Sequence, residues 1–236
     1  MTEELFRSDS YLQECSAEVT AAGAAGIQLS RTVFYPEGGG QPGDRGVLRL
    51  EDGSELAIET TRKGADPGSI LHLPADATAV LEPGTPVTAV IDWQRRYRHM
   101  RMHSCLHLLC ALVEGEVTGG QVGEAKSRLD FNLPDGPPDK VWLEENLNRL
   151  VAEDHAVVPR WIEEAELEAN PQLVRTMSVK PPTGSGRVRL LEIDGVDLQP
   201  CGGTHVARTG EIGVVEVGKI ENKGRQNRRI NLRLAD

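Results

Sequence analysis

Two pairs of metal-binding side chains recur at the same four-residue interval. His103 and His107 lie in the segment HSCLH, and Cys201 and His205 lie in CGGTH about a hundred residues later. On a helix, His103 and His107 project from one face about one turn apart and can chelate a single ion. Three imidazoles and one thiolate form a nitrogen and sulfur set that suits zinc. The sequence therefore predicts one zinc ion per chain, bound by these four residues.

Each pair alone has an ordinary explanation, because two polar residues often share this spacing without binding a metal. Both pairs occur in a chain with only 6 histidines, which favours the metal site. Cys110 follows His107 on the same helical stripe and is an alternative ligand. The helical rise of ~10 Å from His103 to Cys110 is too long for both to share one tetrahedral ion. We therefore expect Cys110 in the core.

A glycine-rich segment, TVFYPEGGGQPGD from Thr32 to Asp44, is the second candidate site. Consecutive glycines let backbone N–H groups approach a ligand closely and can present them to an anion or a developing oxyanion. The alternative is a plain tight turn, which the same glycine content also predicts.

Two basic clusters are candidates for contacts with phosphate groups. The first comprises Arg95, Arg96, Arg98 and Arg101, and the second comprises Lys219, Lys223, Arg225, Arg228 and Arg229. The formal net charge of −10 would disfavour a nucleic-acid binder if it were spread evenly, but acidic side chains concentrate in residues 139–170. Either cluster could instead be a solvated face of the protein.

The elements that must position these residues fall into two blocks. Residues 15–91 contain β-rich runs typical of a small barrel, namely IQLSRTVFY, GVLRL, SELAIET, SILHL, ATAVL and PVTAVI. Helical patterns follow from 92 to about 114 and from about 138 to 155, and four more strands follow them. We expect an α+β protein in which a small N-terminal β-barrel-like domain (1–91) carries the glycine-rich loop. A two-layer α/β sandwich with an antiparallel sheet (92–236) carries the zinc site.

Composition limits where the protein acts. No apolar run approaches the ~18 residues of a membrane-spanning helix, and the start MTEELFRSDS has no signal-peptide pattern. The 4 cysteines show no compact even-spaced framework, so we expect thiols or metal ligands instead of disulfides. These features predict a cytoplasmic protein that does not contact membranes.

Four segments together resemble alanyl-tRNA editing proteins of the AlaX family, which are similar to the editing domain of alanyl-tRNA synthetase. The segments are FYPEGGGQPGDRG, HSCLH, DLQPCGGTHV and GEIGVVEVGKIENKGRQNRRI. They span nearly the whole chain in the family's order, and the length resembles the medium-sized type. The resemblance implies a trans-editing aminoacyl-tRNA hydrolase. Its substrate would be mischarged alanine tRNA that carries serine, with glycine as a second candidate.

The resemblance also implies roles for single residues. His103, His107, Cys201 and His205 match the family's zinc ligands. Thr32 and Gln41 match polar residues of the amino-acid pocket and are the candidate catalytic residues, while the substrate-binding candidates are Gly38, Gly39, Gly40 and Thr204. The loop and the zinc-binding domain would then build one site. We expect tRNA as the partner, and no DNA.

Two other functions remain open at this point. A non-catalytic tRNA-binding module could use zinc only to brace its fold. A metal-dependent hydrolase of small esters or peptides is disfavoured, because HExxH is absent and no carboxylate lies between the paired histidines to act as a base.

Overall fold

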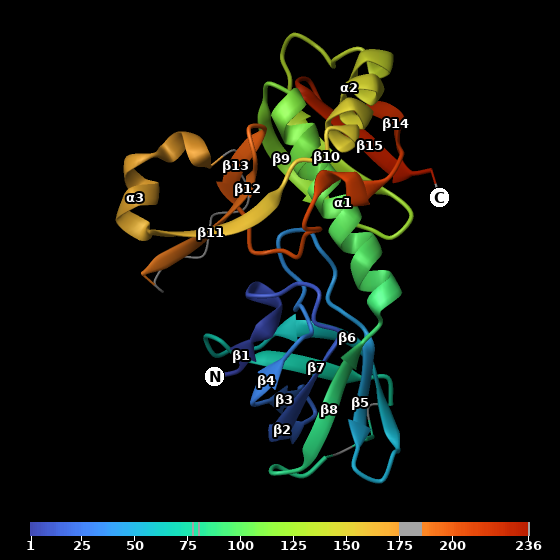
Figure 1. Ribbon diagram of the computed structural model, residues 1–236, viewed down its shortest axis with the longest axis vertical. Helices are drawn as coiled ribbons and strands as arrows, with labels where there is room; N and C mark the ends of the chain where they lie inside the picture. The colour runs from blue at the N-terminus through green and yellow to red at the C-terminus, as the bar shows by residue number, and fades with distance from the viewer. Residues whose placement is uncertain (77, 80, 175–185, 236) are drawn as a thin grey trace. The chain divides into compact units, whose positions relative to one another are not determined.

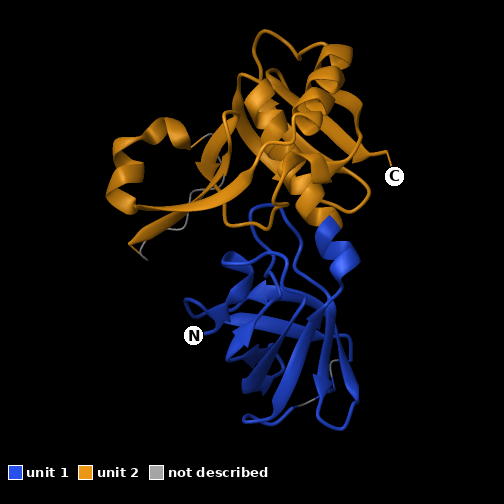
Figure 2. Ribbon diagram, viewed as in Figure 1, with its two compact units in different colours: residues 1–97 blue, residues 98–236 orange. Residues whose placement is uncertain are grey.

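The computed structural model describes residues 1–76, 78–79, 81–174 and 186–235. Two compact units, Met1–Tyr97 and Arg98–Asp236, divide the chain (Figure 2). The division falls within helix α1 (Trp93–Leu112), a few residues after the expected domain boundary at 91.

Unit 1 is built around a closed antiparallel barrel with strand order β2-β3-β7-β6-β5-β8 (Figure 1). Val19, Leu29, Leu48 and Ala89 are fully buried and fill its interior. The barrel strands are β2 (Glu14–Gly23), β3 (Gly26–Leu29), β5 (Gly46–Leu50), β6 (Glu55–Lys63), β7 (Ile70–Pro74) and β8 (Pro86–Ile91). Shorter elements are β1 (Glu3–Glu4), η1 (Leu5–Arg7) and β4 (Arg31–Thr32), and β1 pairs with β4 in parallel. The predicted barrel is confirmed.

Local patterns explain most, but not all, of the barrel strands. Gly53 has φ +83° in the turn between β5 and β6, where Leu50 N donates to Ser54 O at 2.9 Å. Asp-Gly favours this turn because glycine has no Cβ to oppose a positive φ. The strand expected at 77–81 is wrong for residues 78, 79 and 81, which are not in a strand, while 77 and 80 lie outside the described residues.

A four-stranded antiparallel sheet with order β14-β15-β10-β9 forms one part of unit 2. Its strands are β9 (Glu116–Gln121), β10 (Ser127–Asn132), β14 (Val215–Asn222) and β15 (Asn227–Leu234). Helix α2 (Lys140–Ala152) packs on the edge strand β14, where the Asn148 side chain exchanges two hydrogen bonds with the backbone of Val215 at 2.8 and 2.9 Å. These bonds satisfy backbone groups that an open sheet edge would leave to solvent.

A second, three-stranded antiparallel sheet in unit 2 has the order β11-β12-β13 (Figure 1). Its elements are β11 (Val157–Glu163), α3 (Glu164–Ala169), η2 (Pro171–Leu173), β12 (Arg187–Ile193) and β13 (Asp197–Pro200), and η3 (Thr209–Ile212) follows. Leu167 of α3 packs on Val188 and Leu190 and covers one face of the sheet. The protein is thus α+β with antiparallel sheets in its second unit, as predicted. Among the described residues, no helix has the length and apolar character needed to cross a membrane.

Candidate metal centre

Three imidazoles and one thiol meet in unit 2. His103 and His107 lie on α1, while Cys201 and His205 lie in the segment that follows β13. Their ligand atoms all lie within 4.8 Å of one another. The Sγ of Cys201 lies 3.6 Å from Nε2 of His103 and 3.2 Å from Nε2 of His205. The structure thus brings together the four predicted ligands, and this cluster can hold a metal ion.

The loop that carries Cys201 has no regular secondary structure, and hydrogen bonds from Arg189 hold it. Nη1 of Arg189 donates to the carbonyl oxygens of Cys201 at 2.7 Å and Gly203 at 3.1 Å. The amide of Cys201 in turn donates to the carbonyl of Arg189 at 3.1 Å. Strand β12 therefore fixes the backbone that presents the thiol and His205.

Two side chains behind the cluster orient its imidazoles. Oδ2 of Asp197 lies 3.1 Å from Nδ1 of His107, and Oγ of Ser104 lies 3.1 Å from Nδ1 of His205. Asp197 also accepts a hydrogen bond from Nε2 of Gln199 at 2.6 Å. A carboxylate can only accept, so Nδ1 of His107 carries a proton and Nε2 is left for an ion.

The electrostatics of the cluster favour a thiolate. Burial alone would raise the pKa of Cys201, but the imidazoles of His103 and His205 lower that pKa well below its usual value. Burial and the neighbouring His103 lower the pKa of His205 as well. Burial also opposes the charged form of His107, yet hydrogen bonds to Asp197 and Cys201 raise its pKa to about 10. Metals bind the thiolate and neutral imidazoles, so a metal ion at this cluster would displace the second proton of His107.

The remaining cysteines of α1 are packed in the interior. Cys110 is 6% exposed and Cys105 is fully buried, and neither belongs to the cluster of four ligands. Burial raises the pKa of Cys105 to about 12, which keeps this thiol protonated. The prediction that Cys110 packs in the core is confirmed.

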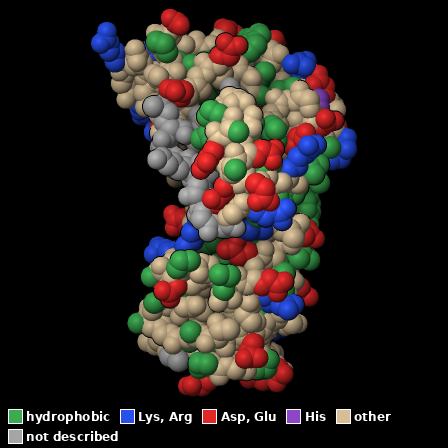
Figure 3. All heavy atoms as spheres, turned by 90° about the vertical axis from the view of Figure 1, so that its left-hand side faces the viewer, with side chains coloured by type: hydrophobic (Ala, Val, Ile, Leu, Met, Phe, Trp, Pro, Cys, Tyr) green, Lys and Arg blue, Asp and Glu red, His purple; other side chains and the backbone are tan. Residues whose placement is uncertain are grey.

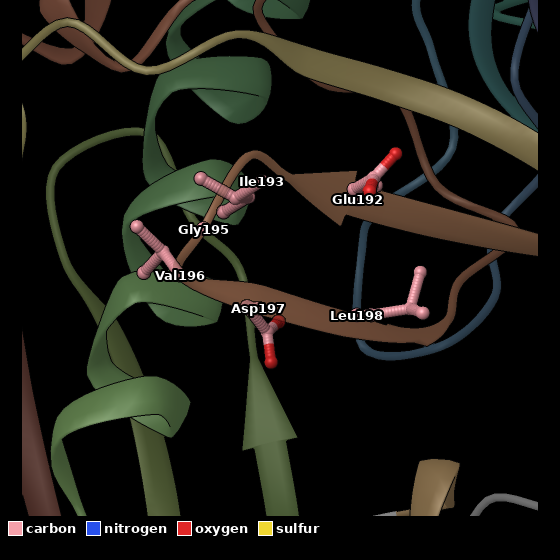
Figure 4. A pocket seen from close by; sticks show the side chains of 6 residues that line it. All are labelled: Glu192, Ile193, Gly195, Val196, Asp197 and Leu198. Atoms are coloured by element: carbon pink, nitrogen blue, oxygen red, sulfur yellow. The ribbon is translucent and has the colours of Figure 1, made fainter.

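Asp197 and Gln199 were not predicted as site residues from the sequence, although both lie in the segment DLQPCGGTH that contains Cys201 and His205. Figure 4 shows Asp197 and Leu198 on opposite faces of β13, as strand alternation requires. The only sequence signal is this alternation, since residues 197, 199 and 201 fall on one face. A shallow, open pocket of about 290 Å³ beside the hairpin is lined by Glu192, Ile193, Gly195, Val196, Asp197 and Leu198.

The tip of the glycine-rich segment is a tight turn in unit 1. Gly38 and Gln41 exchange two backbone hydrogen bonds at 3.1 and 3.0 Å. Gly39 and Gly40 have φ values of +59° and +82°, which is typical of the two-residue hairpin turn that requires positive φ at both central positions. The amides of Gly38 and Gln41 are therefore used within the turn. For residues 38–41, the structure therefore agrees with the tight turn that was the alternative interpretation of this segment.

Thr32 and Gln41 are both fully buried in unit 1. The Thr32 hydroxyl accepts a hydrogen bond from Phe34 N at 3.0 Å and lies 2.8 Å from Nε2 of His72. Nδ1 of His72 lies 3.0 Å from the carbonyl oxygen of Ile27, which can only accept, so Thr32 donates to Nε2. The pocket roles of Thr32, Gln41 and the glycines stay predictions, as does that of Thr204, which is buried beside His205.

Arg96 does not belong to a phosphate-binding surface. Its side chain has 0% exposure and forms an ion pair with Asp44, to which its guanidinium also donates through Nε at 2.9 Å. Asp44 accepts a further bond from Tyr35 N at 2.6 Å, and Arg96 donates to Val33 O at 2.6 Å. This buried pair fastens both ends of the glycine-rich segment. Membership of Arg96 in the predicted tRNA footprint is therefore wrong, because no water or phosphate can reach it.

The other basic residues differ in how much charge they offer. Arg95, Arg98 and Arg101 are half-buried and donate to the carbonyl oxygens of Gly43, Glu124 and Ile212. Arg229 and Lys223 are paired with Asp130 and Glu221, and Arg228 donates to nearby carbonyl groups. Lys219 and Arg225 are exposed. Acidic and basic side chains are interspersed on the face drawn in Figure 3.

Two protein families match parts of the chain. The family described as threonyl and alanyl tRNA synthetase second additional domain matches residues 188–231, which include Cys201 and His205. The family described as tRNA synthetases class II (A) matches residues 6–95, which include the glycine-rich segment.

Relatives match along the entire chain. Alanyl-tRNA editing protein AlaX-M of Methanosarcina acetivorans is 40% identical over 247 residues, which cover 100% of both chains. The AlaX-M protein of Saccharolobus solfataricus is 33% identical over 234 residues, which cover 98% of each chain. The alanine–tRNA ligase of Sulfurisphaera tokodaii is 34% identical over 230 residues, 93% of this chain and 25% of the ligase. At this identity and coverage, the chain belongs to the AlaX family of alanyl-tRNA editing proteins, in its AlaX-M type.

Proposed function

We propose that this protein hydrolyses the ester that joins a wrong amino acid, serine or glycine, to the end of alanine tRNA. The observation that carries the proposal is the buried cluster of His103, His107, Cys201 and His205 in a chain of an editing family. The relatives are named for editing of alanyl-tRNA, which supports a deacylase as the general activity.

We propose zinc as the ion, with one ion per chain. Tetrahedral zinc with ordinary Zn–S and Zn–N bonds separates a sulfur and a nitrogen ligand by ~3.6 Å. The two Sγ to Nε2 distances, 3.6 and 3.2 Å, are close to this value. Three nitrogen atoms and one thiolate also suit zinc better than they suit magnesium or calcium, which prefer oxygen ligands.

Ester hydrolysis needs a water nucleophile and stabilisation of a negatively charged oxygen. A bound zinc ion supplies a Lewis acid for the carbonyl or a lower pKa for water. The chain's own residues hold the ligands in place: Asp197 fixes the tautomer of His107, and Ser104 bonds His205. Asp197 is 3% exposed and already bonded to His107 and Gln199, so its role is orientation and not proton transfer from water.

For the amino acid, we propose that Thr32 and Gln41 contribute to discrimination between serine and alanine. A pocket that hydrogen-bonds a hydroxyl disfavours an analogue without it by a factor on the order of 10⁴. Thr32 is fully buried and its hydroxyl already bonds Phe34 and His72, so contact with the serine hydroxyl would require the surrounding side chains to move. Thr32→Val is expected to weaken serine hydrolysis more than zinc binding, and equal loss of both would contradict this role.

For tRNA, we propose that the predicted basic residues other than Arg96 contact its phosphate groups. This footprint comprises Arg95, Arg98, Arg101, Lys219, Lys223, Arg225, Arg228 and Arg229. Lys219, Lys223 and Arg225 are its exposed members, and Lys223 is paired with Glu221, so Lys219 and Arg225 should account for most of the salt-dependent affinity.

The decisive experiment is deacylation of alanine tRNA charged with serine, glycine or alanine. Wild-type protein should release serine fastest and spare alanine. His107→Ala should abolish release, whereas the matched control His155→Ala should not, because His155 lies outside the cluster and pairs with Glu153. Release of serine by His107→Ala at the wild-type rate would reject the proposed site.

A non-catalytic tRNA-binding module is the second candidate, and one observation favours it. Four protein ligands form a closed set, which is more common in structural than in catalytic zinc sites. Treatment with a chelator separates the two functions. Binding of tRNA without turnover by the zinc-loaded protein would favour the module, and turnover lost with the metal would favour the enzyme.

A further inference from the structure

An exposed tryptophan lies on the outer strand of the three-stranded sheet. Trp161, in the second half of β11, is 47% exposed. Single exposed apolar side chains are common on protein surfaces, so the position of Trp161 relative to the metal cluster decides whether it has a role. The function described above does not use Trp161.

The register places Trp161 on the same face of the sheet as a metal ligand. Trp161 of β11 pairs with Arg189 of β12. Arg189 is in turn opposite Cys201, because the amide of Cys201 donates to the carbonyl oxygen of Arg189 at 3.1 Å. Directly opposed residues project to the same face, so these three side chains form one row across the sheet. Two strand spacings, ~10 Å, separate Trp161 from Cys201.

The other exposed apolar side chains of this sheet lie on its opposite face. Val158 is opposite Glu192, and Glu192 is opposite Leu198, so the side chains of these three residues project to the other face of the sheet. Val158 is 46% exposed and Leu198 is 37% exposed. Among the described residues of the sheet, Trp161 is therefore the exposed large apolar side chain that shares a face with the metal cluster.

A second copy of the chain is a poor occupant for this position. Pro159 lies in the middle of β11, the outer strand, and has no N–H to offer a strand added at that edge. One ion pair borders the ring on its own face, where Arg187 pairs with Glu163 at 3.3 Å. A single exposed ring offers far less area than the ~800 Å² per partner of a stable protein interface, and its size matches a small flat ligand.

We infer that Trp161 is a stacking platform for the terminal nucleobase of the aminoacyl-tRNA, and this inference rests on the proposed function. An aminoacyl group and its base are attached to one ribose, so a site for the ester must have a place for the base within one nucleotide's reach. Every base has an aromatic face that stacks on indole, whatever its edge groups.

Two small substrates separate this role from a structural one. The first is serine esterified to adenosine, and the second is serine esterified to the same ribose without a base. Trp161→Ala should lower kcat/KM for the adenosine ester about 5- to 150-fold, the range for loss of one stacked base. It should leave the base-free ester unchanged, and Trp161→Phe should retain most activity on both. Trp142→Ala is the matched control, because Trp142 is 45% exposed but lies on α2.

Equal loss on both esters, or no loss on either, would overturn the inference. If the wild-type, zinc-loaded protein hydrolyses neither ester nor serine on alanine tRNA, the proposed function fails and the inference fails with it. A binding measurement supplies a readout apart from turnover. The non-hydrolysable serine amide of adenosine should quench the intrinsic fluorescence of wild type and of Trp142→Phe, but not of Trp161→Phe. Equal quenching in Trp161→Phe would also contradict the stacking.

Discussion

Asp197 should control metal affinity without touching the metal. Its Oδ2 lies 3.1 Å from Nδ1 of His107, and the two side chains are 3% and 7% exposed. Loss of such an outer hydrogen bond to a metal-binding histidine weakens metal affinity about 10- to 100-fold, or about 1.4 to 2.7 kcal/mol. Asp197→Asn keeps a neutral acceptor, and neutral bonds are roughly half as strong as charged ones, so we expect about tenfold. Asp197→Ala removes the acceptor, and we expect about 100-fold.

A competition titration against a chromophoric zinc chelator measures these affinities. Glu192→Gln is the matched control, because this carboxylate lies on the same hairpin but pairs with Arg160. The control should bind zinc as wild type does. If Asp197→Ala keeps wild-type affinity, or Glu192→Gln loses as much, the orienting role of Asp197 is refuted.

Three other perturbations test separate parts of the structure. Arg96→Met leaves the buried Asp44 unpaired and should lower the free energy of unfolding in urea by about 3–5 kcal/mol. The control Arg45→Met breaks an exposed pair and should lower it by less than about 1 kcal/mol. Similar losses in the two variants would contradict a stabilising role of the buried pair. Burial lowers the pKa of His72 from 6.5 to about 4, so the unfolded chain takes up a proton first and stability falls by about 3 kcal/mol as pH drops through this window. His72→Gln should remove that part of the pH dependence, and an unchanged slope in its unfolding would count against the buried neutral imidazole. Lys219→Ala combined with Arg225→Ala should lower the slope of log K against log salt for tRNA by up to about 1.8, and an unaltered slope would exclude both from the footprint.

The metal ligands could be predicted because their chemistry and spacing are both visible in the sequence. The four-residue interval of His103 and His107 has a meaning only on a helix, and the repeated HxxxH and CxxxH pattern joins two distant segments. Strands with clear β-branched patterns were equally accessible: β8, β11 and β12 have the bounds that their sequence runs predict. The short strand β13 was not, because its apolar residue Leu198 is exposed and its buried residue Gln199 is polar.

Arg96 shows why charge alone misleads. Four arginines in seven positions look like a basic surface, but Arg96, Met100, His103 and His107 follow the three- and four-residue spacing of the buried face of α1. Its partner Asp44 lies 52 residues earlier, and a local sequence pattern cannot predict an ion pair over that separation. The same reason hides Asp197, since an orienting residue is defined by a neighbour in space and not by one in sequence.

Zinc titration of the apoprotein, with serine release from alanine tRNA as the readout, tests the link between the cluster and the chemistry most directly. The rate should be near background without metal, rise in proportion to added zinc, and level off at one ion per chain. An apoprotein that releases serine as fast as the zinc-loaded protein would contradict the assignment of hydrolysis to this centre.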